Sequence, residues 1–206
     1  MEQHSFHYRP AVEADIVAIE RLVLHNFPHL MHALMGSRPD YIKHKVLIGL
    51  RQTRLHPIAN VFVATNEAEK PIGVVAYDTR DSVTGFNKGR LAALKPLGIM
   101  GMLRFLLMAR YAFYKYMPVD EDVYMRTLAI DRTYRRQGVG CQLWQYAENA
   151  AQSTGYRKAT VLIASKNKAA LSLAEQMNYR LCGEYKTYWR GRIIDEPSLT
   201  YLEKEF

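Results

Sequence analysis

This chain contains few cysteines, the residues that crosslink a fold and that hold zinc in many structural sites. Its 206 residues include only two cysteines, Cys141 and Cys182, and their separation matches no zinc-ligand spacing. A disulfide scaffold is therefore disfavoured, and we expect a reducing, cytoplasmic location. The N-terminal segment MEQHSF also lacks the basic and then apolar regions of a signal peptide, which agrees with that expectation.

Two common phosphate-binding signatures are missing as well. The chain has no G-x-x-x-x-G-K-[S/T] segment, which P-loop enzymes require. The dinucleotide fingerprint G-x-G-x-x-G could begin at Gly138, but Leu143 occupies the position of its third glycine. These two classes of nucleotide-binding protein therefore do not explain the chain.

Acidic residues are scarce in one long segment. The formal net charge is +8, and between Arg80 and Met117 seven basic residues accompany a single acid, Asp81. A basic surface suits an anionic partner, such as a phosphorylated cofactor, an anionic lipid or a nucleic acid. No recognisable nucleic-acid-binding module is present, so we expect no nucleic-acid partner.

The length and composition fit one globular domain over residues 1–206. With 49% hydrophobic and 23% charged residues, the chain can bury a substantial core. Apolar periodicity predicts helices over 13–24 and 40–50, the first of which should end before Pro28. Alternating residues predict a first strand over 5–9 and two hairpins, at 60–77 and 180–205. These elements indicate an α/β fold with a mixed sheet.

The most informative segment is a loop of donors, Arg135-Arg136-Gln137-Gly138-Val139-Gly140. It follows an apolar run over 124–130 and precedes a predicted helix over 141–153. Such a loop binds phosphate because unpaired N–H groups and the helix dipole point at the anion. The two arginines can add charge-assisted hydrogen bonds. The segment therefore predicts a phosphate site.

The second half of this pattern makes it specific. A β-rich run over 158–164 leads into S-K-N-K-A-A, residues 165–170, and then a short helix before Asn178 and Tyr179. Over residues 123–188 this order resembles the acyl-CoA-binding core of the GNAT superfamily of N-acetyltransferases. The family pattern [Q/R]-x-x-G-x-[G/A] is met by Arg135, Gly138 and Gly140.

The resemblance implies a fold that agrees with the predicted elements. We expect a single GNAT-like domain with a mixed, mostly antiparallel central sheet flanked by helices. A long helical insertion, about residues 80–118, should lie between the third and fourth strands.

The resemblance also implies a site for acetyl-CoA as co-substrate. The strand before the loop would separate from its neighbour and pair with the pantetheine arm, and a backbone N–H near Leu128 would polarise the acyl carbonyl. Residues of this site also have a purely structural explanation. Leu128 and Ile130 could be core residues of a strand, and Asn167 could cap the helix that follows it. The implied cofactor-binding residues are Leu128, Ala129, Ile130, Arg135, Arg136, Gln137, Gly138, Val139, Gly140 and Asn167.

No residue is assigned to proton transfer. Many relatives have a tyrosine that reprotonates the departing thiolate, but the corresponding position here is Ala174. Three tyrosines on nearby predicted strands could replace it as the acid: Tyr124, Tyr185 and Tyr188. The packing of a strand would also explain each of them. A thiol pKa of roughly 8.5 makes the thiolate a tolerable leaving group without a dedicated acid. Asn178 replaces a common glycine and tolerates left-handed backbone.

Three histidines, His25, His29 and His32, have helical spacing but enclose Pro28, which should break the helix. No fourth ligand is apparent, so we expect no metal site. In the family this region borders the acceptor site, and residues 27–35 are therefore a candidate for acceptor contact.

The stretch 97–117 is apolar and helix-like, and its three basic residues make it a poor membrane span. We interpret it as a helix packed over the sheet, with its basic side chains reaching solvent. An acceptor-site wall, a homodimer face and a membrane-surface helix are the alternatives.

The sequence therefore predicts an N-acetyltransferase that transfers an acetyl group from acetyl-CoA to a primary amine by direct attack in a ternary complex. The acceptor, a small molecule or a peptide, is not identified. One alternative is an acyl-CoA-binding module without turnover. Another is a membrane-surface acyltransferase that uses a longer acyl chain.

Overall fold

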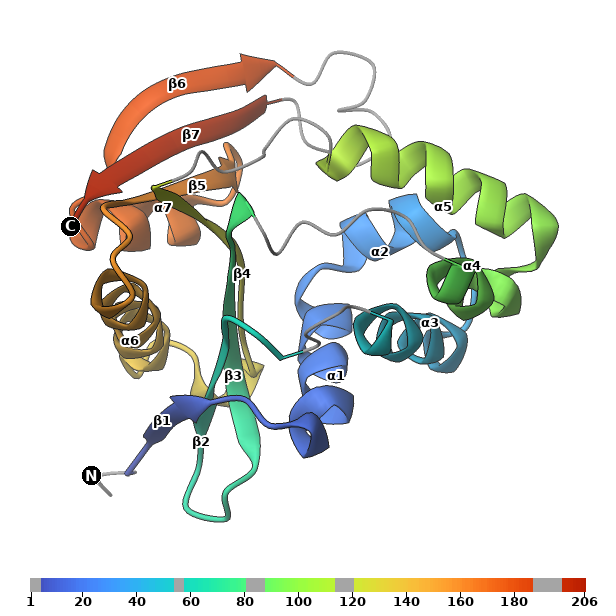
Figure 1. The fold of residues 1–206 in the computed structure, drawn as a ribbon, viewed down its shortest axis with the longest axis horizontal. Helices are drawn as coiled ribbons and strands as arrows, with labels where there is room; N and C mark the ends of the chain where they lie inside the picture. The colour runs from blue at the N-terminus through green and yellow to red at the C-terminus, as the bar shows by residue number, and fades with distance from the viewer. Residues whose placement is uncertain (1–4, 54–57, 81–87, 114–120, 187–197) are drawn as a thin grey trace.

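The structure is a computed structural model that describes residues 5–53, 58–80, 88–113, 121–186 and 198–206. These residues form one mixed sheet with helices on both faces (Figure 1). In chain order the elements are β1 (His7–Pro10), η1 (Glu13–Asp15), α1 (Ile16–Asn26), α2 (Pro28–Met35), α3 (Asp40–Gln52), β2 (Val61–Thr65), β3 (Pro71–Asp78), α4 (Lys88–Leu94), η3 (Lys95–Leu97), α5 (Gly98–Phe113), β4 (Asp122–Ile130), η4 (Arg132–Tyr134), α6 (Val139–Ser153), β5 (Lys158–Ala164), α7 (Lys168–Gln176), β6 (Arg180–Lys186) and β7 (Ser198–Glu205).

The strand order is β1-β2-β3-β4-β5-β7-β6. Only β4 and β5 run parallel among these neighbours, and the other pairs are antiparallel. The expected mixed, mostly antiparallel sheet is confirmed. The predicted helix over 141–153 begins two residues earlier, at Val139, and the predicted strand over 158–164 is β5 with the same bounds.

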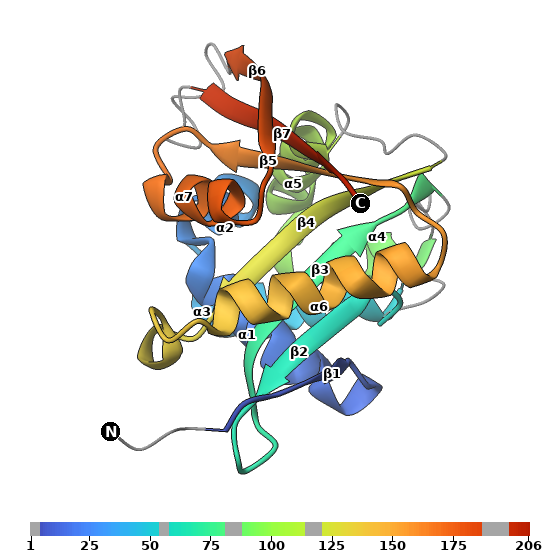
Figure 2. The same cartoon turned by 90° about the vertical axis from the view of Figure 1, so that its left-hand side faces the viewer.

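Helix α6 covers one face of the sheet, and α7 lies on the same side (Figure 2). The core beneath α6 contains Leu143 and Trp144 of the helix and alternate residues of β2 to β5. Two polar contacts hold α6 there: Trp144 Nε1 donates to Tyr179 Oη at 3.1 Å, and Lys204 Nζ donates to Glu148 Oε2 at 2.6 Å. Burial raises the pKa of Tyr179, so its hydroxyl keeps its proton.

Helix α1 packs on the opposite face through Ile19 and Leu22, which meet apolar residues of β2, β3 and β4. From α1, a second helical layer extends away from the sheet and includes α2, α3, α4 and α5 (Figure 1). Met35, Val46 and Leu94 form its core and are fully buried. The expected long helix between β3 and β4 is α5, and it packs on α2 rather than directly over the sheet.

Candidate functional site

The site is built where β4 and β5 separate. Their parallel pairing begins at Asp122–Lys158 and ends at Met125–Val161, although β4 continues to Ile130 and β5 to Ala164. Beyond this point β4 remains paired with β3. The separation that the family resemblance implied is therefore present. Within the described strands, the backbone groups of β4 that face β5 after Met125 have no strand partner.

A β-bulge coincides with the point of separation. Met125 pairs with Tyr77, and the next pair is Thr127 with Ala76, which leaves Arg126 as the extra residue of β4. Sequence reasoning missed this bulge because nothing in the local composition marks an extra residue in an otherwise apolar strand.

The side chain of Arg126 enters a group of buried charges on the α1 face. Its Nε lies 3.1 Å from Asp78 Oδ2. Nearby, Arg51 Nε of α3 donates to Glu20 Oε1 of α1, and both of these side chains are buried. Burial and the charge of Arg51 lower the pKa of Arg126, whereas Asp78 and Glu20 oppose that shift. The group joins α1 and α3 to the part of the sheet where β4 leaves β5.

Two residues with left-handed backbone shape the loop after β4. Arg136 has φ 63° and Gly138 has φ 81°. Gly138 is the N-cap of α6, and the first helical donor is the Gln142 N–H, which bonds Gly138 O at 3.1 Å. The N–H groups from Val139 to Cys141 therefore have no acceptor within α6. This is the donor-rich helix N-terminus that the sequence predicts.

Gly140 lies where α6 begins against β4. A Cβ atom there would be 3.6 Å from Ile130 Cγ1 and 3.9 Å from both Leu128 Cδ2 and Leu173 Cδ2. Leu128 and Ile130 both contribute side chains to the core under α6. Their interpretation as core residues is confirmed. It concerns their side chains alone, and after Met125 the main-chain edge of β4 towards β5 has no strand partner among the described strands.

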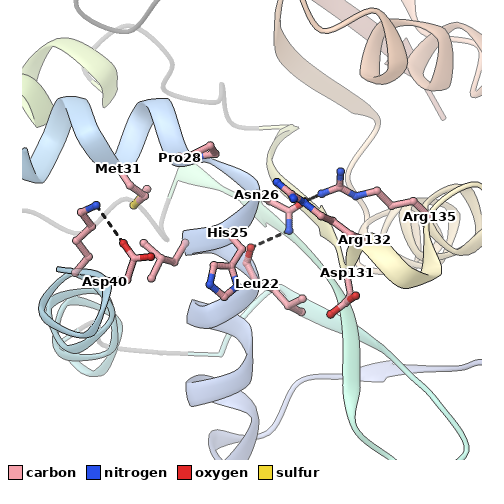
Figure 3. Close-up of a pocket in the computed structure, with 11 residues that line it drawn as sticks. Leu22, His25, Asn26, Pro28, Met31, Asp40, Asp131, Arg132 and Arg135 are labelled. Atoms are coloured by element: carbon pink, nitrogen blue, oxygen red, sulfur yellow. Dashed lines mark hydrogen bonds and ion pairs between the residues drawn. The ribbon is translucent and has the colours of Figure 1, made fainter. Parts of the chain in front are cut away.

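The side chain of Arg135 is exposed but is held by hydrogen bonds that fix the loop. Its Nε donates to Ile130 O at 3.1 Å, and its Nη2 donates to Asn26 Oδ1 at 2.7 Å. Asn26 in turn donates from Nδ2 to Leu22 O at 2.9 Å (Figure 3). Arg135 therefore joins the end of β4 to the end of α1, and the exposed Arg136 is the loop arginine with its side chain towards solvent.

Asp131 stabilises the start of the same loop. Its N–H donates to Ile72 O at 2.8 Å, and its Oδ1 accepts from the Thr133 N–H at 3.0 Å and from the Thr133 hydroxyl at 2.8 Å. These two hydrogen bonds lower the pKa of Asp131, with a smaller contribution from the charges of Lys70 and Arg135. The carboxylate therefore stays ionised at neutral pH and caps η4.

A cavity of about 460 Å³ opens beside the loop, between the α1–α2 junction, the start of α3 and the segment 131–135 (Figure 3). Lys43 is paired with Asp40 at 3.2 Å, which leaves the exposed Arg132 as a basic group at the rim. Pro28 and Met31 belong to the predicted acceptor segment 27–35 and do line the cavity. The full lining is Leu22, Leu24, His25, Asn26, Pro28, Met31, Asp40, Lys43, Asp131, Arg132 and Arg135.

Residues in and next to α7 have structural roles in the fold. Asn167 Oδ1 accepts from the Ala170 N–H at 3.1 Å, so Asn167 caps the helix as one interpretation predicted. Its contact with a cofactor stays a prediction. Ala174 is fully buried in the core under α6, and Asn178 has the left-handed φ of 65° that its replacement of glycine suggested.

The substitute tyrosines lie apart from one another. Tyr124 is partly exposed on β4, and Tyr185 is 39% exposed on β6, whereas Tyr188 lies outside the described residues. Sequence reasoning missed Tyr201 of β7, whose ring packs 6.0 Å from that of Tyr185. Tyr201 pairs with Leu162, one residue past the last β4–β5 pair, and burial raises its pKa. No motif could have marked it, because its place depends on strand register.

The three histidines fall in two helices, since α1 ends at Asn26 and α2 begins at Pro28. Within the described ranges, no group of three or more His, Cys, Asp and Glu side chains is arranged to hold a metal ion.

Comparisons with known proteins identify the family. The acetyltransferase (GNAT) family profile matches residues 27–179. A probable N-acetyltransferase 14 from Xenopus tropicalis is 30% identical over 74 residues, which are 36% of this chain and 35% of the length of that relative.

Solved structures share the fold. An N-acetyltransferase from Staphylococcus aureus Mu50 has a TM-score of 0.68 at 16% identity, over 96% of this chain and 100% of that one. The structure of yncA from Salmonella typhimurium with its cofactor acetyl-CoA has a TM-score of 0.56 at 16% identity, over 97% and 93% of the two chains. With the profile match covering most of its length, the chain belongs to the GNAT acetyltransferase family.

Proposed function

We propose that this protein is an N-acetyltransferase that transfers the acetyl group of acetyl-CoA to a primary amine by direct attack in a ternary complex. One observation carries the proposal. The strand edge left open where β4 separates from β5 leads directly into the loop and helix N-terminus at Arg136 to Gly140.

The residues of this loop suit a diphosphate. The N–H groups at the start of α6 are unused by the helix, and the dipole places positive charge at the same end. Gly138 is exposed and left-handed, so the backbone can approach a ligand without a side chain in the way. Arg136 within the loop and Arg132 of η4, just before it in the chain, add exposed positive charge.

The open edge of β4 suits an extended amide-containing arm. Main-chain groups of Arg126 to Ala129 that face β5 can donate and accept as they would to a neighbouring strand, whereas Ile130 O already accepts from Arg135 Nε. A backbone N–H near Leu128 would lie beside the acyl carbonyl and stabilise the charge that develops on its oxygen. Acetyl-CoA would supply the acyl group as an activated thioester.

Proton transfer in this proposal needs little from the protein. The cavity beside the loop offers Asp131 and Asp40 to attract the protonated amine, which would lose one proton to solvent before its nitrogen attacks the thioester. As the C–S bond breaks, the nitrogen would lose a second proton to solvent, and the departing thiolate would take up a proton to give CoA. Ala174 has no ionisable group and is fully buried, so the thiolate would leave without help from this position of α7. The phenol of Tyr201 stays protonated at neutral pH, and its position opposite Leu162 makes it a candidate donor near the separation point.

Binding without turnover is the second candidate. The absence of a tyrosine at Ala174 favours it, since a non-catalytic module needs the loop but no acid. Turnover with an amine distinguishes the two functions. A longer acyl chain would require space beyond the thioester, and a comparison of acyl-CoA lengths tests that alternative.

The test is calorimetric titration of the full chain with acetyl-CoA, CoA and a long-chain acyl-CoA, followed by thiol-release assays with a panel of amines. Gly138→Asp places a carboxylate where phosphate should bind. Gly155→Asp is the matched control, because Gly155 is also left-handed, with φ 95°, and a Cβ atom there meets no other atom within 4 Å.

We expect the native chain and Gly155→Asp to bind acetyl-CoA and Gly138→Asp to lose binding. Thiol release with at least one amine would then establish transfer. Binding without release for any amine would favour the non-catalytic module. Equal binding by both variants would show that the loop does not hold the cofactor.

A further inference from the structure

An apolar strip lies open on the helical layer. Among the described residues, large apolar side chains that are well exposed gather on α4 and α5, far from the sheet. Ile99 and Met100 are 81% and 75% exposed. We define the strip as Leu91, Ile99, Met100, Leu103 and Leu107.

The strip follows from how α5 is held. Phe105 packs into the core of the helical layer, and Arg104 donates from Nε to Ala33 O at 2.9 Å and from Nη2 to His32 O at 3.1 Å. Arg38 makes a second clamp, with Nη1 bonded to Met35 O at 3.0 Å and Nη2 to Leu97 O at 2.5 Å. These contacts hold the inner side of α5 against the helical layer. They also engage the guanidinium of Arg104, a basic residue of α5 itself.

The outer side of α5 is consequently apolar. At about 100° per residue, Ile99, Leu103, Leu107 and Met100 fall within an arc of about 100°. The inward residues of α5, such as Phe105, are apolar as well, so the helix has two apolar sides. The inner side packs against the helical layer, whereas the outer side is exposed. The side chains on the outer side are exposed to solvent, although they are the large apolar types that usually fill a protein core.

The stretch of sequence that contains the strip carries charge of one sign. From Ser82 to Val119 the sequence contains six Lys and Arg residues and no Asp or Glu. Lys95 is exposed at the turn between α4 and α5. An apolar strip in a stretch of sequence whose charged residues are all cations fits an anionic surface with an apolar interior. A second copy of the chain fits poorly, because two such faces would bring like charges together.

Helices α4 and α5, which carry the strip, pack along the surface of the helical layer and do not extend away from it. The helical segment 89–109 is long and apolar enough to cross a membrane, with a mean hydropathy of 1.6, and 22% of its most apolar window is buried. However, Pro96 and the left-handed Gly98, with φ 68°, divide the segment into α4 and α5. Helix α4 packs on α3, and α5 on α2, so both halves are held flat against the helical layer.

We propose that the outer face of α4 and α5 docks on the surface of an anionic lipid bilayer. The strip inserts among the acyl chains near the head groups, and the cations around it bind the anionic head groups. The helix stays parallel to the membrane. This inference concerns where the protein works, and it does not depend on acyl transfer because its test measures binding without substrate.

The experiment is co-sedimentation of the full chain with phosphatidylcholine vesicles that contain about 30% phosphatidylserine, compared with phosphatidylcholine alone. The strip variant is Ile99→Ser with Leu103→Ser. The control variant is Val17→Ser with Leu181→Ser, which removes two other exposed apolar side chains, 51% and 69% exposed, from α1 and β6. Circular dichroism and melting curves establish that both variants are folded.

We expect the native chain and the control to bind the anionic vesicles and the strip variant to bind at least roughly tenfold more weakly. Binding should weaken when salt rises from about 50 mM to about 500 mM. No binding by the native chain at low salt, or equal binding by both variants, would overturn the proposal. Binding that survives alkaline extraction would overturn it in favour of a membrane span. A native dimer that only the strip variant dissociates, without vesicle binding, would overturn it in favour of self-association.

Discussion

The buried ion pair between Glu20 and Arg51 should contribute more to stability than an ion pair on the surface. Its side chains are 4% and 8% exposed, and the pair joins α1 to α3. Removing one partner of a buried pair costs about 3–5 kcal/mol, because the other charge is left without compensation. We expect Arg51→Met and Glu20→Gln each to lower the free energy of unfolding by that amount. For a chain of this length, the melting temperature should fall by about 6–20 °C.

The two variants should also differ in the size of their effect. In Arg51→Met the nearby guanidinium of Arg126 compensates part of the charge left on Glu20. In Glu20→Gln the guanidinium groups of Arg51 and Arg126 remain with Asp78, and a guanidinium cannot lose its proton. The loss of stability should therefore be larger in Glu20→Gln than in Arg51→Met.

Urea unfolding followed by tryptophan fluorescence measures both effects, because Trp144 is buried in the folded chain. The double variant Glu20→Met with Arg51→Met should recover stability to within about 1–2 kcal/mol of the native chain. Lys43→Met is the control, since its pair with Asp40 is partly exposed and should contribute less than about 1 kcal/mol. If the single variants cost no more than Lys43→Met, the charges are not buried in solution and the reasoning is wrong.

Three further outcomes follow from contacts around the site. Gly73→Ala would place a Cβ atom 2.7 Å from Ile130 Cδ1, so it should lower stability by about 1–3 kcal/mol in urea unfolding. Asn167→Ala should lower stability by about 1 kcal/mol through loss of the cap, whereas Asn167→Asp should retain it; if the alanine variant also weakens acetyl-CoA binding and the aspartate variant does not, the cap and not the amide group matters to the site. The pKa of Asp131 is lowered in the fold, so its stabilisation is present above about pH 3.9 and lost as pH falls through the folded value; Asp131→Asn should reduce the dependence of the urea midpoint on pH in that acid range, and an unchanged dependence would exclude the cap.

The sequence could predict the parts of the site that are continuous in the chain. The loop from Arg135 to Gly140 and the strand and helix on either side of it are local features, and periodicity and glycine placement mark them. The cap by Asn167 and the left-handed backbone of Asn178 are local as well. Each depends on at most a few neighbouring residues, so the chain carries its own signal for each.

The cavity beside the loop could not be predicted in the same way. Pro28 signals the end of α1, but it is also the first residue of α2, a position that proline tolerates because its missing N–H is not needed there. Sequence reasoning used only the first property and missed the helix. The charges of Glu20, Arg51 and Arg126 look like ordinary surface residues until the packing of α1 and α3 on the sheet buries them together.

The extra residue in β4 explains how one strand can support both the core and an open edge. Val123 and Met125 face α6, and so do Leu128 and Ile130, although a regular strand cannot place odd and even positions on the same face. The extra residue at Arg126 shifts the alternation by one position, so even-numbered residues after it face the same side as odd-numbered residues before it. The apolar residues at these positions therefore all stay in the core. Bulges also bend a strand and increase its twist. The bend falls immediately after the last pair with β5, and it therefore accounts for the separation of the two strands without loss of buried apolar surface. The same residue carries a guanidinium into the buried charges that anchor α1 and α3. Arg126 consequently contributes both to the open strand edge and to the packing of the helices that border the cavity.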